Sequence, residues 1–251
     1  MKTATRILAR TVIVILALFI VPALASQALW QWQGGHATSW NTANWRSANM
    51  LPPALDEPEA VIYVMAARTG RWKGGFAVHS WVVTKEKGAA AYNRYDKVGW
   101  GSPIRRNSYA ADANWYSNAP QIIHSVKGRQ AEQLIPRIEK AIESYPYSSR
   151  GDYRIWPGPN SNTFVAHVLD EVPELGASLP SNAVGRDFPG YGRVLKVDPD
   201  HMNLQVNLMG VAGFAIGRRH GIEFNFLGLV TGVDFFDPAI KLPGFGRIGF
   251  F

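Results

Sequence analysis

Short apolar segments separated by glycine, proline and polar turns make up much of the first two thirds of this chain. Residues 60–67 form a continuous apolar run rich in Val, Ile and Tyr, and residues 76–84 form a second. Runs of this length and composition are typical of strands buried on both faces. Residues 92–100 predict a third strand. The polar segment 85–91, which contains Gly88, predicts the hairpin turn that joins it to the second.

Helical periodicity appears further along the chain. Residues 128–145 repeat apolar side chains at intervals of three and four and end at Tyr145-Pro146, which predicts an amphipathic helix. A second helix is predicted over 162–171 and ends before Pro173. Strands followed by helices indicate an α+β domain over 58–251, with an antiparallel sheet and helices packed against it.

The C-terminal part contains an internal repeat. Residues 204–217 include Asn-Leu-Met-Gly-Val-Ala-Gly, and residues 222–235 include Asn-Phe-Leu-Gly-Leu-Val-Thr-Gly. The polar residues 218–221 separate the two, so we predict one long β-hairpin over 204–236, with glycines where the strands bend. A membrane-inserted hairpin is the alternative, but an isolated hairpin leaves unpaired backbone groups in lipid. Packing within the domain is therefore favoured.

The N-terminus has the pattern of a secretory signal peptide over residues 1–25. Lys2, Arg6 and Arg10 precede an apolar run over 11–21, and Ala23-Leu24-Ala25 matches a cleavage site. The alternative is an uncleaved anchor over 11–32, with its tryptophans at the outer interface. Either interpretation predicts an exported protein, periplasmic or anchored in the cytoplasmic membrane. Residues 26–57 are rich in Trp, Asn and Ser and predict a tether or a surface-packed arm.

Composition narrows the function classes. The net charge is +7, but no long run of Lys and Arg occurs, so nucleic-acid binding is disfavoured. The chain has no cysteine, which excludes disulfides, thiolate metal sites and cysteine nucleophiles. The histidines show no metal-ligand spacing, and no phosphate loop or dinucleotide fingerprint follows a strand. We therefore expect no metal and no cofactor.

The segment 156–164, Trp-Pro-Gly-Pro-Asn-Ser-Asn-Thr-Phe, carries the candidate nucleophile. It places Ser161 after a Gly/Pro turn and at the start of the second helix. Unpaired N–H groups and the helix dipole stabilise negative charge there. The alternative is structural, because Ser161, or Asn160 before it, is a good N-cap residue.

His79 is the candidate base. It lies within the apolar strand 76–84, where a buried neutral histidine with one hydrogen bond is the structural alternative. If Lys85 and Ala90 flank the turn, His79 lies opposite Asp96, close enough for the carboxylate to orient the imidazole. A slip of one residue would place Tyr95 or Lys97 there instead.

This order of elements resembles the circularly permuted papain-like folds of the NlpC type, in which a strand bears the histidine and a later helix begins with the nucleophile. The resemblance implies that Ser161 is the nucleophile, in the position of the usual cysteine, and His79 the base. Asp96 would be the third group. Serine has a much higher pKa than cysteine, so it needs stronger base assistance and an oxyanion hole. Loss of the thiol also fits a binding protein descended from an enzyme.

A second resemblance covers most of residues 45–250. Segments 66–74, 79–81, 94–96, 98–101 and 156–164 are similar to an uncharacterised bacterial family, DUF3750. The function of that family is unassigned, so this resemblance implies no mechanism.

Further polar and aromatic residues are candidates for substrate binding. Asn162 would help to hold an oxyanion or bind the local backbone, and Asn160 lies beside it. Arg68 and Arg71 would bind an anionic group or form a solvated basic turn. Trp81 and Trp156 would stack on sugars or fill irregular core.

Three functions remain open from the sequence. The first is a serine-dependent hydrolase or transferase that acts on an amide or ester outside the cytoplasm. The second is a non-catalytic envelope module that binds wall peptide, glycan or lipid in the same cleft. The third is a structural envelope protein that uses the C-terminal hairpin as an interaction surface. The N-terminal segment predicts membrane association in each case.

Overall fold

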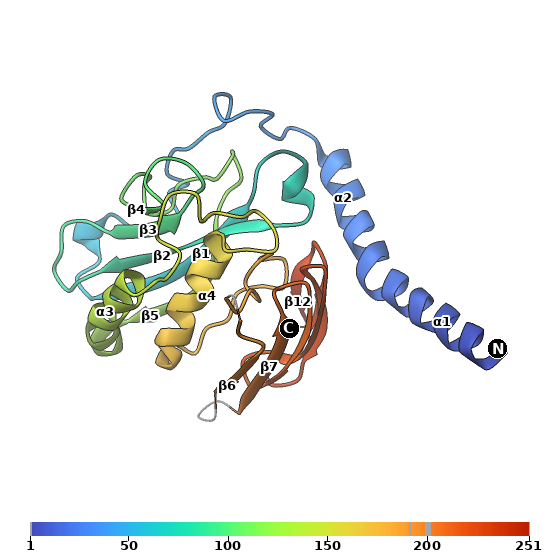
Figure 1. Ribbon diagram of the computed structural model, residues 1–251. Helices are drawn as coiled ribbons and strands as arrows, with labels where there is room; N and C mark the ends of the chain where they lie inside the picture. Colours follow the sequence, from blue (N-terminus) through green and yellow to red (C-terminus); the bar gives the residue numbers. More distant parts are fainter. Residues whose placement is uncertain (1, 191, 199–201, 251) are drawn as a thin grey trace.

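A five-stranded antiparallel sheet with two helices on one face forms the first half of the domain (Figure 1). The computed structural model describes residues 2–190, 192–198 and 202–250. The strand order is β4-β3-β2-β1-β5, and α3 (Gly128–Glu143) and α4 (Ser161–Glu171) cover one face. The strands are β1 (Val61–Arg68), β2 (Val78–Lys85), β3 (Asn93–Lys97), β4 (Ile104–Arg106) and β5 (Gln121–Lys127). The α+β class is confirmed.

The environment of β1, an inner strand of the sheet, explains the continuous apolar run that predicted it. Ile62 and Val64 face the helices, in the same cluster as Phe164. The alternate residues Tyr63 and Met65 face a second apolar cluster on the other side of the sheet. Because both faces of β1 are covered, apolar side chains are favoured at every position.

The predicted register between the second and third strands was wrong by two residues. Val82 pairs with Tyr95 and Thr84 with Asn93, which places Trp81 opposite Asp96. The turn is longer than expected, because β2 ends at Lys85 and β3 begins only at Asn93. A shift of two residues keeps every side chain on its face. His79 and Asp96 therefore remain on the same face as diagonal neighbours.

A long helix precedes the domain and docks on it through its second half. It consists of α1 (Lys2–Ile15), a π-helical turn η1 (Leu16–Ile20) and α2 (Val21–Gln33). The π-turn lies directly before Pro22, which lacks the N–H needed to continue the α-helical pattern. By length and composition, the helical segment Thr3–Gln33 could cross a membrane.

The segment that follows the helix is packed on the domain. Asp112 accepts hydrogen bonds from Ser47 Oγ at 2.6 Å and from the backbone N–H of Met50 at 2.7 Å. Of the two interpretations of residues 26–57, the structure shows a surface-packed arm, whose first residues belong to α2.

The C-terminal part is a seven-stranded antiparallel meander, with its strands in chain order. The strands are β6 (Leu195–Asp198), β7 (Asn203–Leu208), β8 (Ala212–Gly217), β9 (Gly221–Phe226), β10 (Leu229–Asp234), β11 (Ala239–Leu242) and β12 (Gly246–Gly249). The predicted single hairpin over 204–236 was wrong, because each copy of the repeat is itself a hairpin.

The repeated Asn-x-x-Gly pattern forms the turn of each hairpin. Asn207 Oδ1 accepts from the N–H of Gly210 at 2.6 Å, and Asn225 Oδ1 accepts from the N–H of Gly228 at 2.9 Å. Both glycines have φ near +80°, at 78° and 79°. A side-chain acceptor followed by a residue that tolerates this conformation favours a tight turn.

The seven-stranded sheet is apolar on its outer face and polar on its inner face. Cross-strand partners and alternate residues along a strand share a face. By this rule, two outer-face positions in the described strands lack an apolar side chain, namely Thr231 and Gly246. The other outer-face positions are Leu195, Val197, Leu204, Val206, Leu208, Ala212, Phe214, Ile216, Ile222, Phe224, Phe226, Leu229, Val233, Ile240, Leu242 and Ile248. We call this set the apolar outer face.

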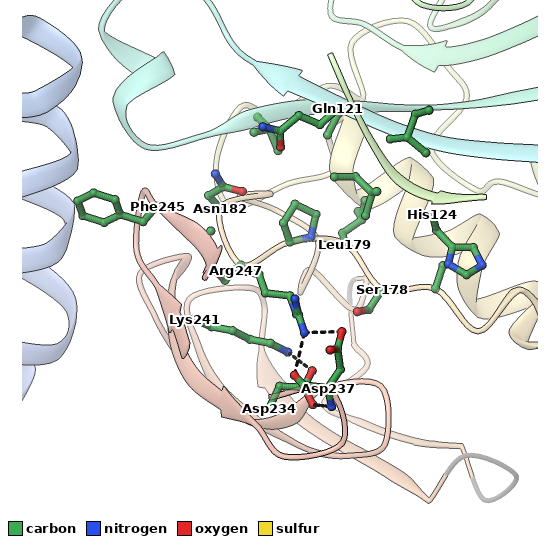
Figure 2. Close-up of a pocket in the computed structure, with 18 of the residues that line it drawn as sticks. Gln121, His124, Ser178, Leu179, Asn182, Asp234, Asp237, Lys241, Phe245 and Arg247 are labelled. Atoms are coloured by element: carbon green, nitrogen blue, oxygen red, sulfur yellow. Dashed lines mark hydrogen bonds and ion pairs between the residues drawn. The ribbon is translucent and has the colours of Figure 1, made fainter. Parts of the chain in front are cut away.

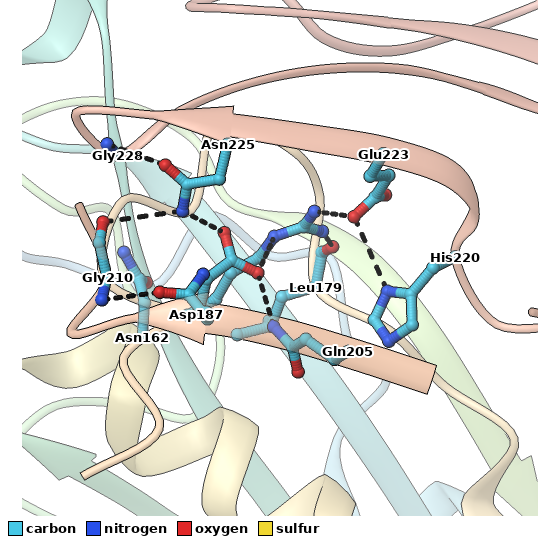
Figure 3. A network of polar contacts seen from close by, with 12 residues as sticks. Asn162, Leu179, Asp187, Gln205, Gly210, His220, Glu223, Asn225 and Gly228 are labelled. Carbon is cyan, nitrogen blue, oxygen red and sulfur yellow. Dashed lines mark hydrogen bonds and ion pairs between the residues drawn. The ribbon is translucent and has the colours of Figure 1, made fainter. Parts of the chain in front are cut away.

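The polar inner face is buried against the loop 177–188 and forms a network of ion pairs (Figure 3). Glu223 binds Arg186, and its other oxygen accepts from Lys241 Nζ at 2.6 Å. Asp187 accepts from Asn225 Nδ2 at 3.1 Å and from Gln205 Nε2 at 3.2 Å.

The pKa values of the two buried carboxyls move in opposite directions. Burial acts to raise the pKa of Glu223, but Arg186, His220 and Lys241 outweigh it, and the pKa is lowered. Burial raises the pKa of Asp187 despite the neighbouring Arg186. Glu223 is therefore the charged centre of the network.

We expect Glu223→Gln to lower the free energy of unfolding by about 3–5 kcal/mol, because it leaves the Arg186 and Lys241 cations buried without their carboxylate. Thermal unfolding followed by tryptophan fluorescence measures this. Because the folded pKa of Glu223 lies below its ordinary value of 4.5, its contribution is present above that pH and is lost as the pH falls. The variant should therefore lose less stability on acidification than the parent.

The matched control is Asp237→Asn, which removes an ion pair of the 80% exposed Asp237 carboxylate with Arg247. We expect a change of at most about 1 kcal/mol. Equal losses in the two variants would contradict a central role for Glu223.

Candidate functional site

Asn160 caps helix α4 and leaves the hydroxyl of Ser161 free of that task. Asn160 Oδ1 accepts from the N–H groups of Asn162 at 2.9 Å and Thr163 at 3.2 Å. Thr163 Oγ1 accepts in return from the N–H of Asn160 at 3.1 Å, which completes a capping box. Ser161 is the first residue of the helix and is buried. Of the two cap candidates, the structure assigns the role to Asn160.

The same capping arrangement connects α4 to the loop that follows it. Asn160 Nδ2 and Asn162 Nδ2 both donate to the carbonyl of Val184, at 3.0 and 2.8 Å. Thr163 Oγ1 donates to the carbonyl of Gly185 at 2.7 Å. The next residues in the loop are Arg186 and Asp187, which bind the seven-stranded sheet.

Tyr153 faces Ser161, and the sequence did not indicate it. The phenol interacts with both the backbone and the side chain of Ser161. Burial raises the pKa of Tyr153 and the charge of Asp96 adds to the effect, while the contacts with Ser161 oppose it. The phenol is therefore neutral at physiological pH. Tyr153 lies in an irregular loop, where no periodicity marks a buried residue.

His79 and Asp96 come together on the other face of the sheet. His79 Nε2 lies 3.5 Å from Asp96 Oδ2, and Arg94 Nη2 donates to the same oxygen at 3.0 Å. The imidazole stacks on Trp115, with ring centroids 3.6 Å apart and an interplanar angle of 6°. The structure thus brings together the predicted base and third group, and adds Arg94 and Trp115.

Burial and the charges of this cluster set its protonation state. Burial lowers the pKa of His79, although the carboxylate of Asp96 opposes the shift. Burial acts to raise the pKa of Asp96, but His79 and Arg94 outweigh it and the pKa is lowered. The pair therefore holds a neutral imidazole beside an ionised carboxylate, the state that a general base requires.

The start of α4 is fixed to β2 at the level of His79. Asn162 Oδ1 accepts from Ser80 Oγ at 2.8 Å, and Asn162 Nδ2 donates to the carbonyl of Val78 at 2.9 Å. His79 lies between Val78 and Ser80 in β2, and its side chain points to the opposite face of the sheet. Among the described side chains, no hydrogen bond joins Ser161 to His79. Tyr153 contacts Ser161, and the charge of Asp96 acts to raise the pKa of the Tyr153 phenol.

A cavity of about 240 Å³ opens beside Tyr153. Its lining includes Trp100, Arg150 and glycines from the loops 98–101 and 149–151. Trp100 is 43% exposed, and the guanidinium of Arg105 lies 5.4 Å from the centre of its ring. Tyr153 lines this cavity, whereas Ser161 is buried and does not line it.

The remaining predicted binding residues have structural partners. Trp81 is buried and donates to the carbonyl of Ala111 at 2.8 Å. Arg68 donates to the carbonyl of Gly74 at 2.8 Å, and the carbonyl of Arg71 accepts from Trp30 of the N-terminal helix at 3.1 Å. Trp156 is 47% exposed and donates to the carbonyl of Leu227 at 2.9 Å.

A second cavity lies between the two sheets and was not anticipated (Figure 2). It measures about 470 Å³, and its lining includes His124 and Ser178 on one side and Lys241 and Arg247 on the other. Lys241 Nζ lies 3.6 Å from Asp234 Oδ2. Ser161, His79 and Tyr153 do not line it. Within the described ranges, no group of three or more His, Asp and Glu could hold a metal ion.

Comparison with known proteins gives one family. A family model described as "Protein of unknown function (DUF3750)" matches residues 59–188, more than half of the chain. The match contains the five-stranded sheet, both of its helices and the Ser161, Tyr153 and His79 positions. It leaves out the N-terminal helix and the seven-stranded sheet. No curated protein and no solved structure matches, so the papain-like resemblance is not borne out.

We expect Asn160→Ala to destabilise the protein by about 1–2 kcal/mol, since it removes the cap and leaves the carbonyl of Val184 with one donor fewer. Ser161→Ala should cost less than half of that, because Ser161 does not cap the helix. Urea unfolding of both variants measures the difference. An equal or larger loss for Ser161→Ala would show that the serine has the structural role.

Proposed function

This chain belongs to the DUF3750 family of proteins of unknown function, and we propose that it is an exported cell-envelope protein with serine-dependent hydrolase or transferase activity toward amides or esters. One observation carries the proposal. The hydroxyl of Ser161 lies at a helix N-terminus, released from capping by Asn160, and faces a neutral phenol whose pKa is raised by burial and by the charge of Asp96.

The capping pattern supports a specific oxyanion donor. Asn160 occupies the N–H groups of Asn162 and Thr163, and the N–H of Phe164 donates to the carbonyl of Asn160 at 3.0 Å. In the first turn this leaves the N–H of Ser161, which faces the phenol of Tyr153. A substrate carbonyl oxygen would replace the phenol at this N–H and place its carbon next to Ser161 Oγ.

In the proposed reaction, Ser161 Oγ attacks the carbonyl carbon. The proton of the hydroxyl passes through the phenol of Tyr153 to the imidazole of His79, and Asp96 stabilises the resulting cation. The bond to the leaving amine or alcohol then breaks, and the leaving group takes up the proton. Water or a second acceptor releases the acyl group from Ser161.

The cellular setting follows from the N-terminal helix. Arg6 and Arg10 precede the apolar part of Thr3–Gln33, and positive charge stays on the cytoplasmic side. The helix then serves as a signal peptide or an anchor and directs the domain outward. Wall peptide and lipid carry amide and ester bonds in that compartment.

A non-catalytic binding module is the second candidate, and the cavity favours it. Arg94 Nη2 and His79 Nε2 both lie near Asp96 Oδ2, at 3.0 and 3.5 Å, as in a structural network. The 240 Å³ cavity presents the aromatic rings of Trp100 and Tyr153, which suit a wall peptide, glycan or lipid.

The activity is tested by labelling the purified protein with a fluorophosphonate. We expect a single adduct on Ser161, identified by peptide mass spectrometry, and a rate at least roughly tenfold lower in His79→Ala and in Tyr153→Phe. The exposed Ser108→Ala is the matched control and should label like the parent. Unchanged labelling in His79→Ala, or no adduct on Ser161, would reject the proposed mechanism.

Two further variants distinguish the second candidate from the first. A binding module should retain its cellular role in Ser161→Ala and lose it in Trp100→Ala, which removes the aromatic wall of the cavity. A serine enzyme should show the reverse order. Complementation of a deletion strain by each variant gives the answer.

A further inference from the structure

We propose that the apolar outer face of the seven-stranded sheet rests on a lipid bilayer, beside the N-terminal helix. This inference concerns how the protein sits on a membrane, and it does not depend on the chemistry of Ser161.

The first observation is that large apolar side chains are exposed on every strand of the face, from β6 to β12. The cross-strand partners Phe214 and Phe224 lie at its centre and are 40% and 52% exposed. Leu195 on β6 is 60% exposed, and Ile248 on β12 is 43% exposed. Seven strands about 4.8 Å apart make the face roughly 29 Å wide. Soluble monomers rarely leave a continuous apolar surface of this size in water.

The inverted polarity of the sheet shows that this surface is a built feature. The inner face buries charged and amide side chains that bind one another and the loop 177–188. A sheet facing water on its outer side would carry the reverse pattern, with apolar residues inward. Polar residues inward and apolar residues outward are the arrangement of sheets that contact lipid.

The N-terminal helix indicates that a lipid bilayer is what covers the apolar outer face. Phe19 of η1 packs against Phe226 of the apolar outer face, with ring centroids 5.8 Å apart. Thr231, the polar member of the face, is only 7% exposed, and its strand β10 contacts η1. The segment Thr3–Gln33 could cross a membrane, and Ile13 and Leu18 are 63% and 44% exposed. The apolar outer face is therefore continuous with a surface whose composition suits lipid.

The sheet's turns suit the boundary between lipid and water. Met209 and Leu227 are exposed at one end of the strands. At the other end are exposed Phe235 and Phe236, and the guanidinium of Arg218 lies 5.8 Å from the ring of Phe236. Arginine beside aromatic side chains is favoured at the headgroups of anionic lipids.

The open edges of the sheet limit how it can be placed. Unpaired backbone groups on the edge strands β6 and β12 cannot lie within hydrocarbon. The face therefore lies on one leaflet, as in a monotopic protein, and the sheet does not span the bilayer. The five-stranded sheet and helix α4, which begins at Ser161, lie on the inner side of the meander (Figure 1). In the proposed placement they therefore face away from the lipid.

The absence of cysteine from the chain allows a direct test with single spin labels. The full-length protein is reconstituted into vesicles of phosphatidylethanolamine and phosphatidylglycerol. Phe214→Cys and Phe224→Cys report on the apolar outer face, and Leu18→Cys reports on the helix. Leu55→Cys, at a side chain that is 77% exposed and outside the sheet, is the matched aqueous control. Circular dichroism checks that each variant is folded.

Collision of the label with oxygen, which concentrates in lipid, is compared with collision with a water-soluble nickel chelate. We expect Phe214→Cys and Phe224→Cys to favour oxygen over nickel, as Leu18→Cys does, and Leu55→Cys to favour nickel. Nickel access at the two sheet positions would overturn the inference, whatever the helix label shows. Exclusion of both reagents would also overturn it, because the face would then be covered by protein, such as a second copy of the chain.

Discussion

The ion pair between Arg186 and Glu223 joins the two halves of this protein. Arg186 lies in the loop that leaves the five-stranded part, and Glu223 lies on the inner face of the meander. Both side chains are buried, so Arg186 and Lys241 compensate the charge of Glu223, and Glu223 and Asp187 compensate the charge of Arg186. Losing one partner would leave an uncompensated charge in the interior, so the contact constrains both halves at once.

The loop residues that precede Arg186 connect this ion pair to the candidate site. Val184 and Gly185 accept hydrogen bonds from Asn160, Asn162 and Thr163 at the start of α4, and Arg186 follows directly in the chain. The position of the helix N-terminus, and with it the hydroxyl of Ser161, is therefore coupled to the packing of the second sheet. The segment that matches the family model ends at residue 188, so it includes this connecting loop.

The polar interior of the meander also accounts for its unusual exterior. Strand residues alternate between faces, so a sheet that uses one face for an ionic network has the other available for apolar side chains. In water, such an exposed apolar face would favour aggregation. Against a bilayer, as we propose, the face would add to the attachment made by the N-terminal helix, and the two would form one membrane-facing surface.

Local pattern was enough to predict the elements of the first half. Apolar runs marked β1 and β2, periodicity marked α3, and the Gly/Pro turn before Asn160 marked the start of α4, because each signal comes from neighbouring residues. Local signals also marked Ser161 and His79 as candidates, whereas Asp96 was chosen from a predicted cross-strand register. Local pattern also detected the Asn-x-x-Gly repeat, though not that each copy closes its own hairpin.

Contacts between distant residues were decided only by the tertiary structure. The register of β3 depended on a turn longer than its composition suggested, and an even shift kept His79 and Asp96 on one face. Tyr153 lies in an irregular loop, so its approach to Ser161 had no local signal. The sequence by itself determined which residues are apolar and how they alternate. Whether the apolar side of each strand faces inward or outward depends on what packs against it. The polar side of the meander faces inward because Arg186 and Asp187 of the loop pack against it, and the side chains on that side are their ion-pair and hydrogen-bond partners.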